Sequence, residues 1–565
     1  MDNDDDDHPL IVQRDGKLLV EVEGPAYPEV REALGGFAQL ERSPERIHTY
    51  RLTALSLWNA AAVGLDYESV ARVLTRWSRY PVPDEVLNLV REQLSRFGRT
   101  RLVRGADDEL LLTSDDASVL GLAGADGPTA ALFRRRDAGG AAIAAKDRGA
   151  LKQAMVRLGY PVEDLCGYVD GAPLAIALRD HDGRGRPFAL RAYQAAAVEA
   201  FHVGGGVRGG AGVVVLACGA GKTVVGIGAM SRVGARTLVL TTSTFAARQW
   251  IREIIDKTHV PAEAVGEYTG TRKDVRPITV ATYQMLTHRT SSEGEFPHLK
   301  LLRDAGWGLV IYDEVHMLPA PVFRATAELQ ARRRLGLTAT LVREDGREDD
   351  VFALIGPKRF ELPWKVLEQQ GFIAEATCTE VRVELSRERR VAHALAPRRD
   401  RFRLAAENPA KGPLVARLLA EHAGVPALVI GQFLDQIGEL SRELGLPLIT
   451  GATPQVERER LFDRFRRGEE RALVVSKVAN FAIDLPDAGL LIQVSGTFGS
   501  RQEEAQRLGR VLRPKARPSR FYTLVSRDSV EQEFAAKRQM FLVEQGYRYD
   551  IVAGDDLAVG ALKPF

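Results

Sequence analysis

The chain has 565 residues, of which 45% are hydrophobic and 27% charged, and its formal net charge at pH 7 is +2. This composition is that of ordinary soluble globular proteins, and the length corresponds to several domains. No apolar run approaches the roughly 18 residues that span a bilayer, so we expect no membrane partner. The three cysteines, Cys166, Cys218 and Cys378, lie too far apart to form a zinc or iron–sulfur site by themselves. Because the net charge is small, local basic patches would have to bind any polyanion.

The first third of the chain is expected to form a tail, an accessory domain and a linker. Residues 1–8 are acidic, the reverse of a signal peptide, and we expect a disordered tail and a cytoplasmic protein. Residues 9–105 alternate strand-like pieces such as 18–22 with helical stretches such as 86–94, which predicts an α+β accessory domain. Residues 106–187 are expected to form a linker. The Gly-, Ala- and Asp-rich stretch 104–150, which overlaps this range, predicts loose structure, and a helix follows over 151–160.

From residue 188 onward, short aliphatic runs alternate with helical stretches. The first series of runs covers 213–216, 237–241, 278–281, 309–312 and 335–338. The second series begins near Leu414 and covers 427–431, 447–450, 472–475, 490–494 and 521–525. This pattern is typical of parallel sheets with crossover helices. We therefore expect two tandem α/β lobes at 188–365 and 411–545, a connector at 366–410 and a C-terminal tail at 546–565.

A glycine turn follows the first of these runs and opens a helix. The backbone N–H groups of such a turn, together with the helix N-terminus, surround phosphate oxygens. Lys222 would reach the β- and γ-phosphates, and the Thr223 hydroxyl would ligate Mg²⁺. Leu216 stands where the strict motif has its first glycine. The remaining residues of the predicted nucleotide loop are Cys218, Gly219, Ala220 and Gly221.

An acidic pair follows the loop at a distance of about ninety residues. Asp313 ends an apolar strand, which places its carboxylate at the sheet edge where α/β folds bind ligands. A carboxylate there can hold Mg²⁺, and the adjacent Glu314 can orient and deprotonate the attacking water. An isolated Asp-Glu pair would more simply be a solvated turn. The spacing after a phosphate loop favours a site that hydrolyses ATP with Mg²⁺.

Two further patterns suggest communication between the lobes. Thr338 and Thr340 flank a small residue at another strand end, where they either relay a γ-phosphate signal or are ordinary strand-end hydroxyls. Arg510 and Arg513 are three residues apart, hence on one helical face. They either belong to a basic surface helix or act as arginine fingers on the transition-state charge. A hydrolysis site shared by two lobes suits translocation along a polymer better than metabolic phosphoryl transfer.

These elements, in this order, resemble superfamily 2 helicases. Three segments narrow the resemblance to the XPB family of DNA-repair helicases in its bacterial form: 319–323, Arg343-Glu344-Asp345 and QRLGRVLRPK at 506–515. The resemblance covers about 188–545, and residues 158–171 are similar to the damage-recognition region of the family. It implies two tandem RecA-like lobes preceded by an α+β accessory region.

The resemblance also implies roles for individual residues. Arg191 and Gln194 would read adenine, Asp484 would contact the nucleotide, and Gln506 would act beside the two arginines. His316, Thr338 and Thr340 would couple hydrolysis to motion. Arg343, Glu344 and Asp345 would act at the duplex junction. The other DNA contacts implied are Thr242, Arg248, Thr282, Tyr283, Gln284, Thr450 and Ser476.

The family implies an ATP-dependent 3′–5′ DNA helicase or double-strand translocase of nucleotide excision repair. It would be a monomer at the nucleoid, acting on forked or damaged duplex beside an endonuclease. A reduced thumb would fit within 375–410, where residues 386–403 hold seven arginines against Glu388 and Asp400. These arginines either follow phosphates or form a solvated hairpin. Alternatives are the motor of a restriction or remodelling translocase, an ATP-gated damage-binding module and an RNA helicase.

Overall fold

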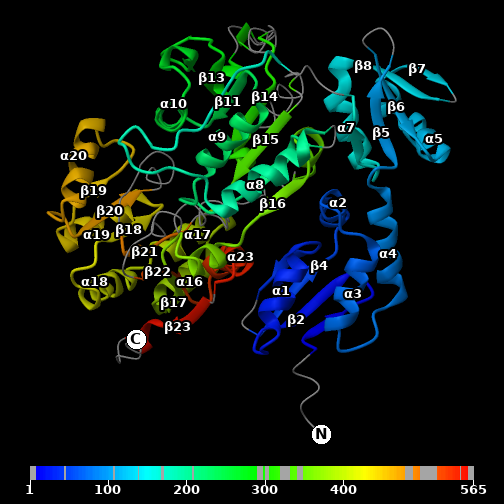
Figure 1. Cartoon of the computed structure of the whole chain (residues 1–565). Coiled ribbons are helices and arrows are strands. Elements are labelled where there is room, and N and C mark those ends of the chain that lie inside the picture. The colour runs from blue at the N-terminus through cyan, green and yellow to red at the C-terminus, as the bar shows by residue number, and fades with distance from the viewer. Residues whose placement is uncertain are drawn as a thin grey trace. The chain divides into compact units, whose positions relative to one another are not determined.

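A computed structural model gives the fold of residues 8–557 (Figure 1). Outside its description lie 44–45, 106–108, 138, 167–170, 207–208, 289–296, 299–304, 319–330, 332, 340–347, 477–487, 497–517 and 548. The chain forms two compact units: 1–39, 49–216 and 221–361 make the first, and 40–48, 217–220 and 362–565 make the second. Among the described helices, none has the length and apolar character needed to cross a membrane.

The N-terminal residues form a small α+β domain. Its sheet has the order β1-β2-β4-β3. Strand β2 and helix α4 confirm the strand and helix expected at 18–22 and 86–94. The elements are β1 (Leu10–Val12), β2 (Lys17–Glu21), α1 (Tyr27–Gly35), β3 (Gln39–Arg42), β4 (Ile47–Arg51), α2 (Ala54–Ala62), α3 (Tyr67–Trp77) and α4 (Asp84–Arg96).

A second sheet occupies the stretch that we expected to be loosely structured, and that expectation is wrong. The sheet has the order β7-β8-β6-β5-β9. The small residues that suggested a loop form its buried strand β8, where a side chain at Gly140 would collide with the Leu112 carbonyl. The elements are β5 (Thr100–Arg104), β6 (Glu109–Ser114), α5 (Ala117–Ala125), α6 (Gly127–Ala130), β7 (Phe133–Asp137), β8 (Gly140–Ala144), α7 (Arg148–Arg157) and β9 (Val162–Asp164).

The first α/β lobe is built on a seven-stranded sheet of order β12-β13-β11-β14-β15-β10-β16. Its neighbouring strands pair in parallel, so their carboxyl ends meet at one edge. All five expected strands are confirmed. The elements are α8 (Ala192–His202), β10 (Ala211–Val215), α9 (Lys222–Val233), β11 (Thr237–Thr241), α10 (Thr244–Lys257), β12 (Val265–Tyr268), β13 (Ile278–Thr282), α11 (Tyr283–Thr287), β14 (Leu309–Asp313), β15 (Arg333–Thr338), α14 (Glu348–Leu354) and β16 (Lys358–Glu361).

The second α/β lobe has a parallel sheet of order β19-β20-β18-β21-β22-β17-β23. The five strands expected here are also confirmed. The elements are α15 (Trp364–Gln369), β17 (Ala376–Val383), α16 (Arg387–Leu395), α17 (Arg398–Ala406), α18 (Lys411–Glu421), β18 (Ala427–Gly431), α19 (Leu434–Leu444), β19 (Leu448–Ile449), α20 (Gln455–Arg466), β20 (Ala472–Ser476), β21 (Leu490–Gln493), β22 (Ser519–Ser526), α23 (Val530–Glu544), β23 (Tyr549–Ala553) and α24 (Gly554–Leu557).

The second lobe begins earlier in the chain than expected, because strand β17 lies inside the predicted connector. It pairs in parallel with both β22 and β23. Its polar residues concealed it: Glu380 is buried within the strand, where it pairs with Arg382 and accepts a hydrogen bond from Gln539 Nε2 at 2.6 Å. A charged residue with partners inside the protein does not produce an apolar run in the sequence.

Helices α16 and α17 stand where we placed a reduced thumb. Arg389 donates to the carbonyls of Leu404 and Glu407, at 3.3 and 2.8 Å. Arg403 pairs with the carboxylates of Glu407 and Asp435. Arg389 therefore joins α16 to the end of α17, and Arg403 joins α17 to α19. The contact of these arginines with DNA stays a prediction.

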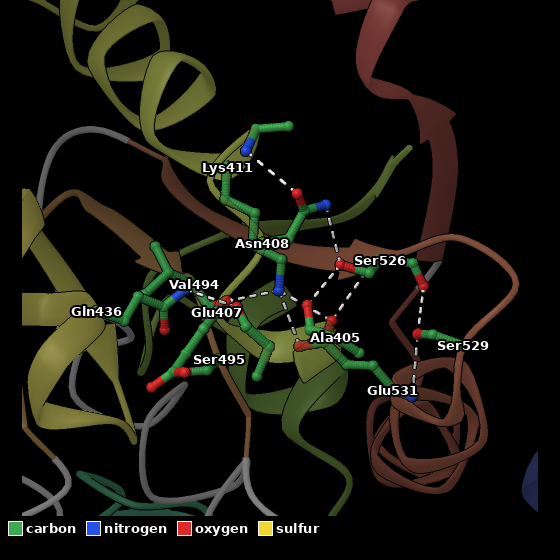
Figure 2. A network of polar contacts seen from close by, with 12 residues as sticks. Ala405, Glu407, Asn408, Lys411, Gln436, Val494, Ser495, Ser526, Ser529 and Glu531 are labelled. Carbon is green, nitrogen blue, oxygen red and sulfur yellow. Dashed lines mark hydrogen bonds and ion pairs between the residues drawn. The ribbon is translucent and has the colours of Figure 1, made fainter. Parts of the chain in front are cut away.

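A buried ion pair joins helices α18 and α23 in the core of the second lobe (Figure 2). Lys411 Nζ lies 2.9 Å from Glu531 Oε2 and donates to the Val494 carbonyl at 2.8 Å. Glu531 also accepts the backbone N–H of Ser526 at 2.9 Å. One fully buried pair thus connects two helices to the ends of β21 and β22.

Candidate nucleotide-binding and hydrolysis site

The phosphate loop connects β10, in the interior of the first lobe's sheet, to helix α9. Gly219 and Gly221 have φ values of +84° and +81°, a region that favours glycine. A Cβ added at Gly221 would lie 2.6 Å from the Gln194 amide nitrogen. Because Gly221 has no side chain with which to cap α9, the N–H groups of the first helical turn suit an anion. Cys218 and Thr223 are half-buried, and Ala220 is buried.

Lys222 opens α9 and faces the acidic pair at the end of β14. Its Nζ lies 3.5 Å from Glu314 Oε1. Strands β10 and β14 both pair with β15, which explains how residues ninety positions apart meet. The structure therefore brings Lys222, Asp313 and Glu314 together as predicted.

Asp313 is held at two of its atoms. Its Oδ2 accepts the Trp250 Nε1–H at 2.9 Å, and its carbonyl accepts the Tyr283 hydroxyl at 2.7 Å. Burial and the neighbouring Glu314 raise the pKa of Asp313 to about 6. Two adjacent buried carboxylates repel each other when both are ionised, so a cation beside them is favoured.

Glu314 has a left-handed backbone, with φ 52° and ψ 54°. Burial opposes its ionisation, but Lys222 and His316 outweigh burial and lower the pKa of Glu314 overall. Among the described residues nothing donates a hydrogen bond to its Oε2. An ionised carboxylate with one such oxygen suits a general base that accepts a proton from water.

His316 joins the acidic pair to the neighbouring strand. Its Nδ1 lies 2.6 Å from the Thr338 hydroxyl and 3.6 Å from Glu314 Oε2. Thr338 ends β15, and its carbonyl accepts the Leu216 N–H at 3.0 Å, where the phosphate loop begins. The predicted coupling residues His316 and Thr338 thus lie between the hydrolysis residues and the loop.

The predicted adenine-reading residues start helix α8. The Gln194 amide oxygen accepts the Arg191 N–H at 3.0 Å, which caps the helix, and Gln194 is buried beside Gly221. Arg191 Nη1 donates to the Tyr193 hydroxyl at 3.2 Å. Gln194 thus lies at the loop and Arg191 next to it at the start of α8, and adenine recognition by them stays a prediction.

The predicted DNA contacts of the first lobe divide by exposure. Arg248 and Gln284 are exposed: Arg248 pairs with Glu267 at 3.2 Å, and Gln284 donates to the Thr242 carbonyl at 3.3 Å. Thr282 and Tyr283 are buried, with 4% and 3% of their surface exposed. Direct DNA contact by the Tyr283 side chain is therefore corrected to an internal role, because its hydroxyl bonds to Asp313.

In the second lobe, Thr450 is half-buried and its hydroxyl accepts the Ala452 N–H at 3.2 Å. Ser476 ends β20 and is buried, and its contact with DNA stays a prediction. Eight predicted site residues lie outside the described part of the chain: Thr340, Arg343, Glu344, Asp345, Asp484, Gln506, Arg510 and Arg513.

Sequence reasoning missed Trp250 as a partner of Asp313. Its signal is a tryptophan on the buried face of α10 combined with a glycine, Gly226, on the facing helix. Neither residue identifies the contact without knowledge of how the helices pack.

The residues present fit a magnesium–nucleotide complex. Within the described ranges, no group of three or more His, Cys, Asp or Glu side chains could hold a metal ion. Mg²⁺ in nucleotide sites needs only one or two protein oxygens, because phosphates and water supply the rest. Asp313 and Thr223 offer hard oxygen donors of this kind, and the carboxylate pair favours a cation beside it.

Comparison with known proteins gives three family matches. The ERCC3/RAD25/XPB C-terminal helicase family matches residues 367–558. A helicase conserved C-terminal domain family matches residues 10–137, and the family of the type III restriction enzyme res subunit matches residues 187–343.

Individual relatives match nearly the whole chain. The DNA 3′-5′ helicase XPB of Kineococcus radiotolerans is 54% identical over 98% of both chains. The protein of the same name from Mycobacterium tuberculosis is 51% identical over 98% of this chain and 99% of its own. The general transcription and DNA repair factor IIH helicase/translocase subunit XPB of Antonospora locustae is 36% identical, over 96% of this chain and 81% of its own.

Proposed function

The chain belongs to the XPB family of DNA 3′-5′ helicases, and we propose that it uses ATP hydrolysis to open duplex DNA in nucleotide excision repair. The observation that carries the ATP chemistry is the cluster of Lys222, Asp313 and Glu314 at the carboxyl edge of the first lobe's sheet. Relatives named as helicases over nearly the full chain support DNA as the polymer.

We propose the following roles for the residues of the site. Lys222 neutralises phosphate charge, and the first turn of α9 donates backbone N–H groups to the phosphates. Asp313 and Thr223 would hold Mg²⁺, which when bound neutralises the β- and γ-phosphate oxygens. Glu314 Oε2 accepts the proton of the attacking water, because its carboxylate is ionised and this buried oxygen accepts no hydrogen bond from the described residues.

Coupling is assigned to residues that touch the hydrolysis cluster. We propose that a change at Glu314 during hydrolysis is transmitted to strand β15 through the hydrogen bond between His316 and Thr338. Arg510 and Arg513, with Gln506 beside them, would complete the site as arginine fingers worth roughly 10³–10⁵ in rate. Their role rests on the sequence pattern at 506–515.

DNA recognition should be largely independent of base sequence. We assign phosphate or sugar contacts to Thr242, Arg248 and Gln284, which have exposed or half-exposed positions. The segment 343–345 would act at the duplex junction. We further propose a monomer that works at the nucleoid in the cytoplasm beside an endonuclease. Co-purification from the native host tests that partner.

A forked-duplex unwinding assay tests the proposed function. One substrate carries only a 3′ single-stranded tail and the other only a 5′ tail. We expect unwinding of the 3′-tailed substrate with ATP and Mg²⁺, and none with a non-hydrolysable ATP analogue. Unwinding restricted to the 5′-tailed substrate, or equal unwinding without hydrolysis, would contradict the proposal.

The motor of a restriction or remodelling translocase is the second candidate, favoured by the restriction-subunit family that matches residues 187–343. Such a motor hydrolyses ATP on duplex DNA without separating strands. Displacement of a triplex-forming strand from a blunt duplex, in the absence of fork unwinding, would favour it. ATP turnover stimulated by RNA rather than DNA would instead identify an RNA helicase.

A further inference from the structure

Asp313 is fixed by two aromatic side chains from two other elements. Trp250 of α10 donates its indole N–H to the carboxylate oxygen Oδ2 at 2.9 Å. Tyr283, the first residue of α11, donates its hydroxyl to the backbone carbonyl of Asp313 at 2.7 Å. One bond fixes the carboxylate and the other fixes the main chain, so the direction of the second carboxylate oxygen is determined as well.

Trp250 is wedged against the phosphate-loop helix. A Cβ added to Gly226 of α9 would collide with its indole ring and would lie 3.3 Å from Leu337 of β15. The ring therefore fits only because α9 has a glycine at this position. With 2% of its surface exposed, Trp250 is buried where it bonds to the Asp313 carboxylate.

The helices that supply these two side chains also adjoin the proposed DNA contacts. Helix α10 begins at Thr244, two residues after Thr242, and α11 begins at Tyr283, one residue before Gln284. The Gln284 side chain donates to the Thr242 carbonyl at 3.3 Å, which joins the two segments. Both segments therefore adjoin a donor to the same residue, Asp313.

We propose that Trp250 and Tyr283 are positioning residues that orient the Asp313 carboxylate for Mg²⁺ and transmit DNA contact at Thr242 and Gln284 to the hydrolysis site. This inference rests on the proposed function, in which Asp313 holds Mg²⁺. Groups that hydrogen-bond a metal-ligating carboxylate typically change metal affinity or activity by about 10–100-fold when removed. Neither aromatic residue touches nucleotide or water in this account.

Two conservative variants of the full chain remove the donors. Trp250→Phe keeps an aromatic ring on α10 but loses the N–H, and Tyr283→Phe loses one oxygen atom. Matched controls are Trp307→Phe, buried near the opposite end of β14, and Tyr268→Phe, whose hydroxyl lies 2.7 Å from His298 Nδ1. Each pair makes the same chemical change in the same lobe, with and without a bond to Asp313.

The first measurement is binding of a fluorescent ADP analogue, in EDTA and in Mg²⁺. We expect both donor variants to bind as wild type in EDTA, which also shows that they are folded. We expect the concentration of Mg²⁺ that gives half of the gain in nucleotide affinity to rise about 10–100-fold. The controls should follow wild type under both conditions.

The second measurement is the stimulation of ATP turnover by forked DNA at saturating Mg²⁺. We expect the ratio of turnover with DNA to turnover without DNA to fall at least about fivefold in both donor variants. A change of about fivefold is the lower end of typical coupling between sites. Wild-type magnesium dependence in Tyr283→Phe overturns the positioning role, even if Trp250→Phe fails to fold. Altered magnesium dependence with full DNA stimulation overturns the transmission role. A wild-type protein without magnesium-dependent ATP turnover would contradict the proposed function itself.

Discussion

At the scale of single residues, the hydrolysis site depends on the backbone of Glu314. Its left-handed conformation, φ 52° and ψ 54°, is one that a residue with a side chain adopts at a cost of about 1–3 kcal/mol. The conformation turns the chain after β14, so that Asp313 and Glu314 bond to different partners. Asp313 faces Trp250 while Glu314 faces Lys222 and His316.

The contact between His316 and Thr338 is predicted to couple hydrolysis to unwinding. Thr338→Val preserves shape but removes the hydroxyl that lies 2.6 Å from His316 Nδ1. We expect DNA-stimulated ATP turnover to persist, while base pairs opened per ATP fall by at least about fivefold. Parallel ATPase and unwinding assays measure the ratio.

The matched control is Thr237→Val, at the opposite end of the same sheet, where the hydroxyl donates to the Ala235 carbonyl at 2.9 Å. It should leave the ratio of unwinding to turnover unchanged. An equal loss in both variants would show that buried hydroxyls of this sheet matter for stability rather than coupling.

The residue scale also shows what the sequence could predict of the site. Lys222, Asp313 and Glu314 were found because a glycine turn and an acidic strand end have recognisable local patterns. The internal role of Tyr283 was missed because its burial and its bond to Asp313 depend on tertiary packing. Trp250 was missed for the same reason, since no local pattern records a hydrogen bond across 63 residues.

At the scale of elements, the buried Lys411–Glu531 pair of Figure 2 connects helices α18 and α23 in the core of the second lobe. Glu531→Ala leaves the Lys411 ammonium buried without its carboxylate, a change that typically costs about 3–5 kcal/mol. We expect faster hydrogen–deuterium exchange in α18, α23 and the end of β21. Mass spectrometry of peptides from those segments measures it.

Glu421→Ala is the control for this prediction. Arg417 Nε lies 2.7 Å from Glu421 Oε1, but about a third of each side chain is exposed, at 34% and 30%. Exposed pairs contribute about 0–1 kcal/mol, so exchange should remain close to wild type. Equal protection loss in the two variants would refute the special role of the buried pair.

Strands were predictable from sequence where their interior positions are continuously apolar, as in β11 and β18. Strand β8 was missed because small residues suggested a loop, although a glycine at 140 is needed where β8 approaches the Leu112 carbonyl. Strand β17 was missed because Glu380 and Arg382 pair inside the lobe. Both errors have the same cause: these strands are buried by tertiary packing and pairing, and their local sequences lack the run of large apolar residues that indicates a buried strand.

At the scale of the whole molecule, the first unit contains most of the two accessory sheets and of the first α/β lobe, and polar contacts join them. Arg148 and Asp164 form a buried pair, with Lys152 Nζ 3.6 Å from the same carboxylate. Gln153 Nε2 donates to Asp350 Oδ1 of α14 at 2.8 Å. Burial opposes ionisation of Asp164, but Lys152 and Arg148 lower its pKa to about 2.

Asp164→Asn is therefore expected to destabilise the first unit. The ionised form is favoured in the folded protein, so this contribution is full well above pH 3.8 and is lost as the pH falls toward 2. At pH 7 we expect the variant to unfold at lower urea concentration than wild type, and the difference should shrink from pH 4 to pH 2. A pH-independent difference would exclude this electrostatic origin.

The overall charge predicts how DNA binding responds to salt. With a net charge of only +2, affinity must come from local phosphate contacts. We expect the logarithm of affinity to fall linearly with the logarithm of salt, with a slope of about −0.9 per neutralised duplex phosphate. Two duplexes of unrelated sequence should give the same slope and affinity in fluorescence anisotropy. A strong preference for one of them would contradict recognition through the backbone.

The central claim is that Glu314 activates water in a DNA-driven ATPase. It is tested most directly by ATP turnover of wild type and Glu314→Gln, with and without forked DNA. Glutamine keeps the size of the side chain but is not a base, so DNA-stimulated turnover should fall by about 10²–10⁴-fold, while binding of a fluorescent ADP analogue persists. DNA-stimulated turnover in Glu314→Gln equal to that of wild type would contradict the account.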